Sequence, residues 1–248
     1  MKLFSVVMLL FVLLSGSGAV AEHLRLAGDV WPPFTDQRLP NNGLAVDLAS
    51  SALLRAGHTT EYVEVPWARV LRGLQQGDYD VIVAAWYADD RARYGLFSEP
   101  YLVNRIRFLR RSGMTLDYRG LRSLRPYSIA VVRGYSYDSA FDAARELSKV
   151  PVMEFAMGAR MLAAGRVQLA VEDELVARHY LNQELREIRG MVEFVETPLS
   201  ENGLHILVRR SHPLHQQLVR EFNASIRAMR EDGSYRRIFR RHGLADAE

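Results

Sequence analysis

The chain has 248 residues, of which 48% are hydrophobic and 25% charged. This is the balance of an ordinary globular protein, which excludes wholesale disorder. The chain has no cysteine, which excludes disulfide scaffolds, thiolate metal sites, iron–sulfur clusters and thiol nucleophiles. It also removes the cysteine that a lipoprotein needs for acylation.

The formal net charge is +3, and the basic residues are spread among nearly as many acids. The one local basic run, at 236–241, lies in a helical pattern near the C-terminus, where cations complement the helix dipole. Charge runs of this kind form solvated helix faces. We therefore expect no nucleic-acid partner.

The first 21 residues have the pattern of a secretory signal peptide. Lys2 is followed by an apolar run over Leu3–Leu14, and Ala19-Val20-Ala21 forms a cleavage site before Glu22. The apolar run, about 12 residues, is shorter than the about 20 that a membrane-spanning helix needs. We expect cleavage, export to the periplasm and no lipid anchor.

Strand and helix patterns alternate through the first hundred residues of the exported part. Alternating or continuous apolar residues predict strands, and apolar residues at helical spacing predict helices that glycines end. Strands are predicted at 23–28, 60–65 and 80–85, and helices at 47–56 and 67–76. The prolines at 32 and 33 exclude a helix after the first strand.

A second alternating series follows a strand predicted at 105–111. Strands are expected at 128–132, 150–155, 169–172, 191–196 and 204–209, and helices at 136–147, 159–164, 175–181, 212–230 and 234–242. Strands that alternate with helices are typical of the α/β class with mostly parallel sheets. The two series suggest two lobes of similar design.

Five segments, in this order and spacing, resemble the family 3 bacterial extracellular solute-binding proteins. They are Gly77–Ile82 followed by Arg91, Phe97–Tyr101, Gly134–Ser136, Gly165–Val167 leading to Asp173, and Gly233–Ile238. The resemblance covers essentially the whole exported chain. No single motif is specific, but the ordered set is.

The resemblance implies a type II periplasmic binding protein fold with a ligand cleft between two lobes. Lobe 1 would comprise residues 22–106 and 207–248, and lobe 2 residues 107–206. Ligand would lie at the carboxyl ends of strands, where open α/β sheets bind ligands. Closure would be hinge bending of the lobes around the ligand.

The resemblance also implies three polar ligand contacts. Arg91 would hold the ligand α-carboxylate bidentately, although nearby Asp89 and Asp90 leave a surface ion pair as the alternative. Ser136 would start a helix and offer its hydroxyl to the same carboxylate, or be an ordinary N-cap. Asp173 would accept from the ligand ammonium group, or cap the helix that begins near Leu175.

Trp31, Trp67 and Trp86 fall where relatives carry the aromatic walls of the cleft, with core or surface packing as the alternative. An aromatic wall favours flat or cationic side chains. Ala88 stands where relatives have threonine, and Val83, Ala84 and Trp86 stand where they often have small hydroxyl residues. A standard amino acid ligand is therefore in doubt, and we favour a cationic or aromatic amino acid, or a related amine-bearing acid, over an acidic ligand such as glutamate.

The expected function is capture of a small zwitterion by a monomer that delivers it to an inner-membrane ABC permease, with no catalytic residue, metal or cofactor. One alternative is an enzyme similar to cyclohexadienyl dehydratase. Its acidic residue would lie three positions after Asp173, and Val176 stands there, which argues against that reading. A sensory role is the other alternative, and neighbouring permease genes would favour transport.

Overall fold

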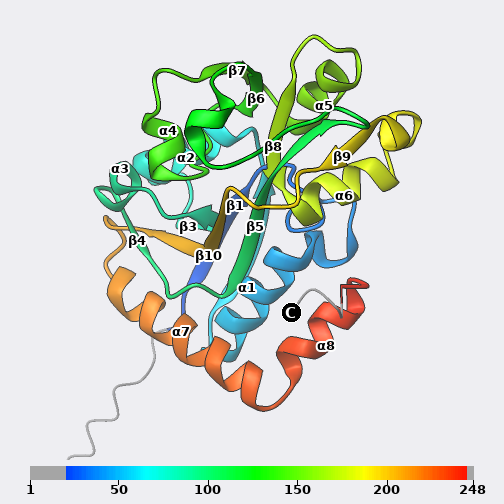
Figure 1. Ribbon diagram of the computed structural model, residues 1–248. Helices are drawn as coiled ribbons and strands as arrows, with labels where there is room; N and C mark the ends of the chain where they lie inside the picture. Colours follow the sequence, from blue (N-terminus) through cyan, green and yellow to red (C-terminus); the bar gives the residue numbers. More distant parts are fainter. Residues whose placement is uncertain (1–20, 245–248) are drawn as a thin grey trace, which may run out of the picture.

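A computed structural model describes residues 21–244 (Figure 1). The expected signal segment, up to residue 20, and residues 245–248 lie outside the described part. Among the described residues no helix is both long and apolar enough to cross a membrane.

The protein is α/β, with one curled ten-stranded sheet. Its strands, in chain order, are β1 His23–Gly28, β2 Thr59–Glu64, β3 Val81–Trp86, β4 Gly95–Phe97, β5 Leu102–Arg111, β6 Ser128–Val132, β7 Ser148–Val152, β8 Leu169–Asp173, β9 Val192–Phe194 and β10 Ser200–Arg209. The spatial order is β2-β1-β3-β10-β5-β8-β6-β7, with β4 beside β10 and β9 beside β5. Three parallel strands lie at each end of this order, and antiparallel pairs formed by β10 and β5 join them.

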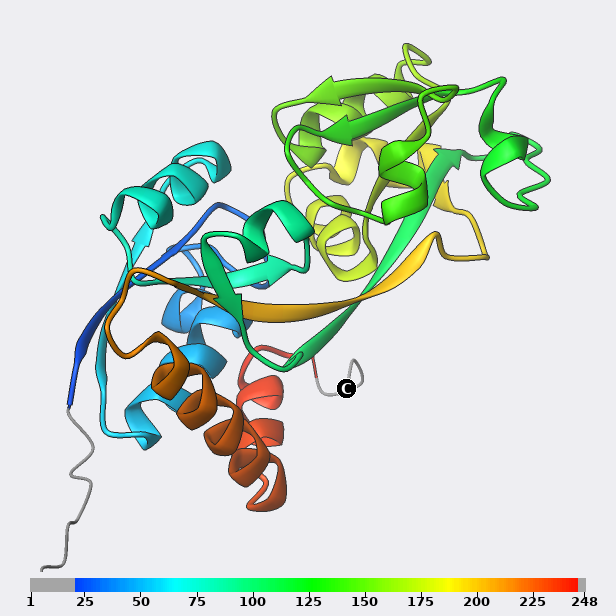
Figure 2. The same ribbon diagram turned by 90° about the vertical axis from the view of Figure 1, so that its left-hand side faces the viewer.

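Figure 2 shows two groups of elements with the long strands β5 and β10 running between them. The predicted lobe boundaries at 106/107 and 206/207 lie within these two strands. The strands pair antiparallel from Ser200↔Ile106 to Leu204↔Leu102. Two hydrogen-bonded strands thus form the connection between the groups.

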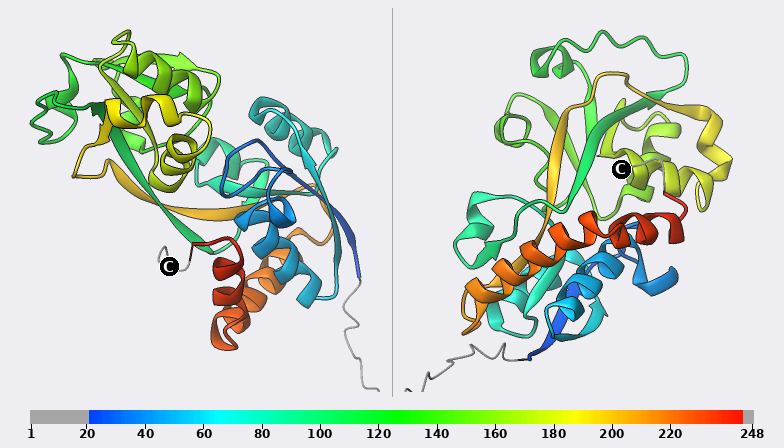
Figure 3. Two further views of the ribbon diagram at one scale, coloured as in Figure 1. Left: turned by 90° about the vertical axis from the view of Figure 1, so that its right-hand side faces the viewer. Right: turned by 90° about the horizontal axis from the view of Figure 1, so that it is seen from below.

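Eight α-helices cover the sheet in the described part of the chain. They are α1 Leu44–Arg55, α2 Trp67–Gln76, α3 Asp89–Ala92, α4 Ser139–Ala143, α5 Phe155–Ala163, α6 Glu174–Asn182, α7 His215–Glu231 and α8 Ser234–Arg241, with 3₁₀ turns at Pro40–Asn42, Leu121–Leu124 and Arg186–Met191. Figure 3 shows α7 and α8 lying beside α1. Helix α2 buries Val70 and Leu74 against Ile82 of β3 and Leu207 of β10.

Most predicted elements are present with shifted ends. Helix α2 and strands β1 and β6 have the predicted bounds, whereas the short elements α3 and β4 were not predicted. The strand predicted at 150–155 ends at Val152, because Phe155 begins α5 and is buried in the core.

The helix predicted at 136–147 is wrong in both its start and its length, since α4 covers only Ser139–Ala143. Asp138 caps it by accepting the Phe141 N–H at 2.8 Å. Buried Tyr137 holds the preceding segment on β6, because its hydroxyl accepts the Val132 N–H at 2.8 Å. The segment 134–137 is therefore a loop at the carboxyl end of β6.

Candidate functional site

The segments that carry the predicted site meet at the carboxyl ends of parallel strands from both lobes. Trp31 follows β1, Trp86 ends β3, Asp173 ends β8, and the loop 134–137 follows β6. Trp67 is the first residue of α2, as predicted. This convergence is the place where α/β sheets bind ligands.

Arg91 lies on α3 with only 3% of its surface exposed. Its guanidinium donates from Nη1 to the Trp86 carbonyl at 3.0 Å and from Nη2 to the Gly134 carbonyl at 2.9 Å, and it lies 5.2 Å from the centroid of the Trp67 ring. Burial lowers the pKa of Arg91. Within the described part of the chain it has no salt bridge, so the surface ion pair with Asp89 or Asp90 is not formed.

The Gly134 carbonyl also accepts the Trp67 indole N–H at 3.2 Å. One backbone oxygen of the predicted lobe 2 therefore receives donors from two side chains of the predicted lobe 1. Gly134 has φ of 80°, a conformation that glycine adopts without steric cost. The turn is what presents this carbonyl to lobe 1.

Tyr135 fills the space between the three tryptophans. Its ring makes edge-on contacts with Trp31, Trp67 and Trp86, with centroids 6.5, 6.3 and 5.6 Å apart. The cavity left between these side chains is about 20 Å³, close to the space of one water molecule. Ligand pockets are typically about 300 Å³ or larger, so an amino acid requires the Tyr135 ring to move.

Ser136 lines this cavity but does not start a helix. It lies three residues before Ser139, where α4 begins, so the predicted N–H donors and dipole of a helix N-terminus are absent at Ser136. Only the position of Ser136 in the cavity lining supports the predicted contact between its hydroxyl and a ligand carboxylate.

Asp173 is buried, and it caps α6. Its Oδ1 accepts the backbone N–H groups of Leu175 at 2.9 Å and Val176 at 3.0 Å. Its Oδ2 accepts from the Asn104 amide at 3.1 Å, and Asn104 Oδ1 accepts the Trp86 indole N–H at 2.9 Å. Burial raises the pKa of Asp173 to about 6. The capping alternative is thus observed, and Asp173 is linked to the cavity wall through Asn104.

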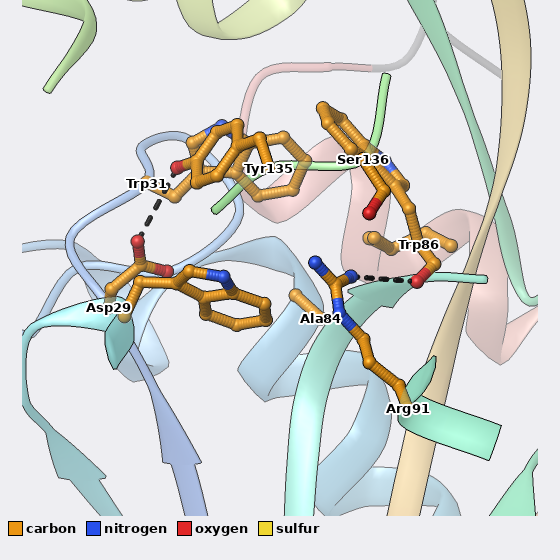
Figure 4. A pocket seen from close by; sticks show the side chains of 9 residues that line it. Asp29, Trp31, Ala84, Trp86, Arg91, Tyr135 and Ser136 are labelled. Atoms are coloured by element: carbon orange, nitrogen blue, oxygen red, sulfur yellow. Dashed lines mark hydrogen bonds between the residues drawn. The ribbon is translucent and has the colours of Figure 1, made fainter. Parts of the chain in front are cut away.

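Two further acids are connected to the cavity: Asp29 lines it, and Glu172 bonds to Trp31, which lines it. Asp29 lines the cavity and accepts from the Tyr135 hydroxyl at 3.4 Å, and burial raises its pKa to about 6 (Figure 4). Glu172 is fully buried and accepts the Trp31 indole N–H at 3.3 Å. Burial raises its pKa to about 8.

Sequence reasoning missed Asp29, Asn104, Tyr135 and Glu172. Tyr135 stands inside a quoted motif, between Gly134 and Ser136, and Asp29 directly follows the first predicted strand. Both positions could have been found from the rule that ligands lie at strand ends. Glu172 and Asn104 lie inside strands, and nothing in their spacing predicts that they bond to the tryptophans of the cavity wall.

The arrangement is an aromatic-walled cavity lined by Arg91 and Asp29, and two further buried acids bond to its walls, Asp173 through Asn104 and Glu172 through Trp31. A family model for bacterial extracellular solute-binding proteins, family 3, matches residues 24–245. The protein belongs to this family. Among residues 21–244 no group of three or more histidines, cysteines or acids is placed to hold a metal ion.

One curated relative is the arginine-binding periplasmic protein of Mannheimia haemolytica. It is 23% identical over 232 residues, covering 89% of this chain and 91% of the relative. An ancestral arginine-binding protein bound to arginine has a similar structure, with a TM-score of 0.72 at 24% identity over 88% of this chain and 96% of that one.

Other members of the same fold differ in role. A histidine kinase sensor domain gives a TM-score of 0.74 at 23% identity, covering 87% of this chain and 93% of that domain. An ancestral amino acid-binding protein, a precursor of cyclohexadienyl dehydratase, gives 0.71 at 21% identity, covering 88% and 94%. At these identities the likeness shows the shared fold.

Proposed function

We propose that the protein captures an amino acid in the periplasm by closure of lobes 1 and 2 and delivers it to an inner-membrane ABC permease. The observation that carries the proposal is the buried Arg91 guanidinium facing a cleft walled by Trp31, Trp67 and Trp86. A guanidinium binds a carboxylate bidentately. A ligand carboxylate would take over the donors that the Gly134 carbonyl now receives.

Asp173 supports the other half of a zwitterion clamp. Its pKa is raised by burial, and its oxygens already accept from Asn104 and from α6. A ligand ammonium group at this position would add a positive charge beside a buried acid. Arg91 would then bind the carboxylate of the ligand, and Asp173 would bind its ammonium group.

The ligand class favoured by the cleft walls is an amino acid with a flat or cationic side chain. The three tryptophans contact the edge or face of the Tyr135 ring, and this packing around a planar group supports the proposal. A cation over an indole face gains about 0.5–2 kcal/mol. The curated relative is named for arginine binding, which agrees with a cationic ligand.

The proposed role is binding without chemistry. A dehydratase similar to cyclohexadienyl dehydratase would need a general acid, and the position expected for it is Val176, fully buried in α6. A sensory role remains the second candidate, favoured by the likeness to the sensor domain. Uptake of labelled ligand by cells with and without the gene separates transport from sensing.

A thermal-shift screen of the purified protein against amino acids, amines and small acids tests the binding function. A ligand that binds only the folded state raises the unfolding midpoint. The hits are then titrated by calorimetry and by intrinsic fluorescence. Since all three tryptophans surround Tyr135, binding should change the fluorescence, and tightest binding to glutamate would contradict the ligand class.

A further inference from the structure

Glu172 is a fully buried carboxyl with one oxygen unused. Its Oε1 accepts the Trp31 indole N–H at 3.3 Å and the Asp173 backbone N–H at 2.8 Å. Its Oε2 has no hydrogen-bond partner among the described residues. A buried acceptor without a donor is costly, and a buried unpaired charge more so. The carboxyl therefore needs either a proton or a cation.

No cation among the described residues supplies that charge. The groups that face Glu172 are Asp29 and Trp31 after β1, Tyr135 and Tyr137 after β6, Tyr180 on α6, and Asp173 on its own strand. Arg107, its neighbour across β5, bonds instead to Glu174 and the Val195 carbonyl. Arg91 gives both outer nitrogens to carbonyls.

Trp31 connects this carboxyl to the cavity. Its indole N–H binds Glu172, while its ring lines the cavity and contacts the Tyr135 ring. The Tyr135 hydroxyl also interacts electrostatically with Glu172, so a ligand side chain that takes the place of Tyr135 lies against Trp31 and within electrostatic reach of the carboxyl. Resting on the proposed amino-acid binding, we propose that Glu172 selects a ligand whose side chain carries a second positive charge, a guanidinium or ammonium group.

The first test compares charged ligands with neutral ones of similar shape, arginine with citrulline and lysine with norleucine. Calorimetry should show that the wild-type protein prefers the charged member of a pair by about tenfold or more, the scale of a charge-assisted bond. Glu172→Gln, which keeps the shape and removes the charge, should abolish most of that preference. An unchanged preference in Glu172→Gln would overturn the proposal.

Glu174→Gln is the matched control. Glu174 is the next residue, and it pairs with Arg107 and Arg178 rather than facing the cleft. This variant should keep the wild-type preference. If it loses the preference as Glu172→Gln does, the effect is not specific to Glu172 and the proposal fails.

A second measurement uses only the wild-type protein, so it does not depend on the folding of a variant. Near pH 6.5, between the ordinary pKa of a glutamate and the value of about 8 in the cleft, a neutral ligand leaves Glu172 protonated, whereas a cation displaces the proton. Calorimetry in two buffers of different ionisation enthalpy should show that arginine binding releases a proton to the buffer and that citrulline binding releases none from Glu172.

Equal proton exchange with both ligands would overturn the role of Glu172 while leaving amino-acid binding intact. Failure of every amino acid to bind the wild-type protein would instead overturn the proposed function, and this inference with it.

Discussion

Two buried groups at the cavity, Arg91 in its lining and Glu172 behind Trp31, differ in how their charges are satisfied. Arg91 is nine-tenths or more buried, but both outer nitrogens of its guanidinium meet carbonyls. Glu172 is more deeply buried, and one of its oxygens has no partner among the described residues. A ligand carboxylate must therefore compete with two backbone carbonyls for Arg91. Glu172 instead needs a hydrogen-bond donor that the described residues do not provide.

The largest expected effect comes from removing Arg91, the group whose charge is satisfied. Arg91→Ala should weaken binding of any carboxylate ligand by about 3–5 kcal/mol, because the ligand anion would be desolvated without a partner. Calorimetry with the ligand found in the screen measures this loss. Arg93→Ala changes an exposed arginine two residues away and should bind normally.

Because Arg91 also bonds to the Trp86 and Gly134 carbonyls, thermal unfolding of Arg91→Ala must accompany the affinity measurement. A folded Arg91→Ala protein that binds within twofold of the wild type would remove Arg91 from the clamp.

Glu172, with its unpartnered oxygen, should make the free energy of unfolding depend on pH. Glu172 has a pKa raised to about 8, so between its ordinary value and pH 8 the folded state binds more protons than the unfolded state, and stability falls as pH rises. From pH 6 to 8 the wild type should lose about 2 kcal/mol relative to Glu172→Gln. Thermal unfolding of both proteins across this range measures the difference.

Asp29 and Asp173, with pKa values raised to about 6, act in the same direction at lower pH. His179, His205 and His212 have lowered pKa values and act oppositely below their ordinary range. The difference between wild type and Glu172→Gln cancels these contributions. A difference that stays constant from pH 6 to 8 would show that Glu172 does not titrate there.

Two substitutions of Asp173 distinguish its role as a helix cap from a role in ligand binding, and their expected effect on stability is smaller. Asp173→Ala removes the N-cap of α6 and should cost about 1 kcal/mol, lowering the unfolding midpoint by about 2–4 °C. Asp173→Asn keeps an effective cap and should unfold near the wild-type temperature, yet bind a zwitterion more weakly. If Asp173→Asn binds as the wild type does, capping is its whole role.

The smallest effect is expected from Tyr135→Phe. This change removes a hydroxyl whose bond to Asp29 is long, 3.4 Å, but keeps the ring between the tryptophans. Stability should change by about 0.5 kcal/mol. A much larger loss in thermal unfolding would show that the hydroxyl, rather than the ring, holds the two sides of the cleft together.

The helices and strands could be predicted because the spacing of apolar residues along the chain determines most of them. The spacing of Val70 and Leu74 predicts α2, and the continuous apolar run of β3 predicts a strand buried on both faces. The helix at Ser136 was wrong because two contacts override its pattern: the Asp138 cap and the Tyr137 hydroxyl on Val132.

The site could be predicted in part. Arg91, the three tryptophans and Ser136 line one cavity, although their roles toward a ligand stay a prediction. Asp173 lies outside the lining and reaches the wall through Asn104. Glu172 could not be predicted, because its environment is made by Trp31, 141 residues earlier in the chain. Burial that arises from such distant contacts leaves no local pattern.

The contact at Gly134 has a consequence for how this molecule tolerates change. Trp67 and Arg91 of lobe 1 both donate to a main-chain oxygen, which is present whatever side chain residue 134 carries. On the acceptor side the contact depends on a backbone φ of 80°, which glycine adopts without strain and other residues rarely do. Mutational drift can therefore abolish the contact at three positions, the two donors and Gly134 itself, so its inheritance depends on both of its sides.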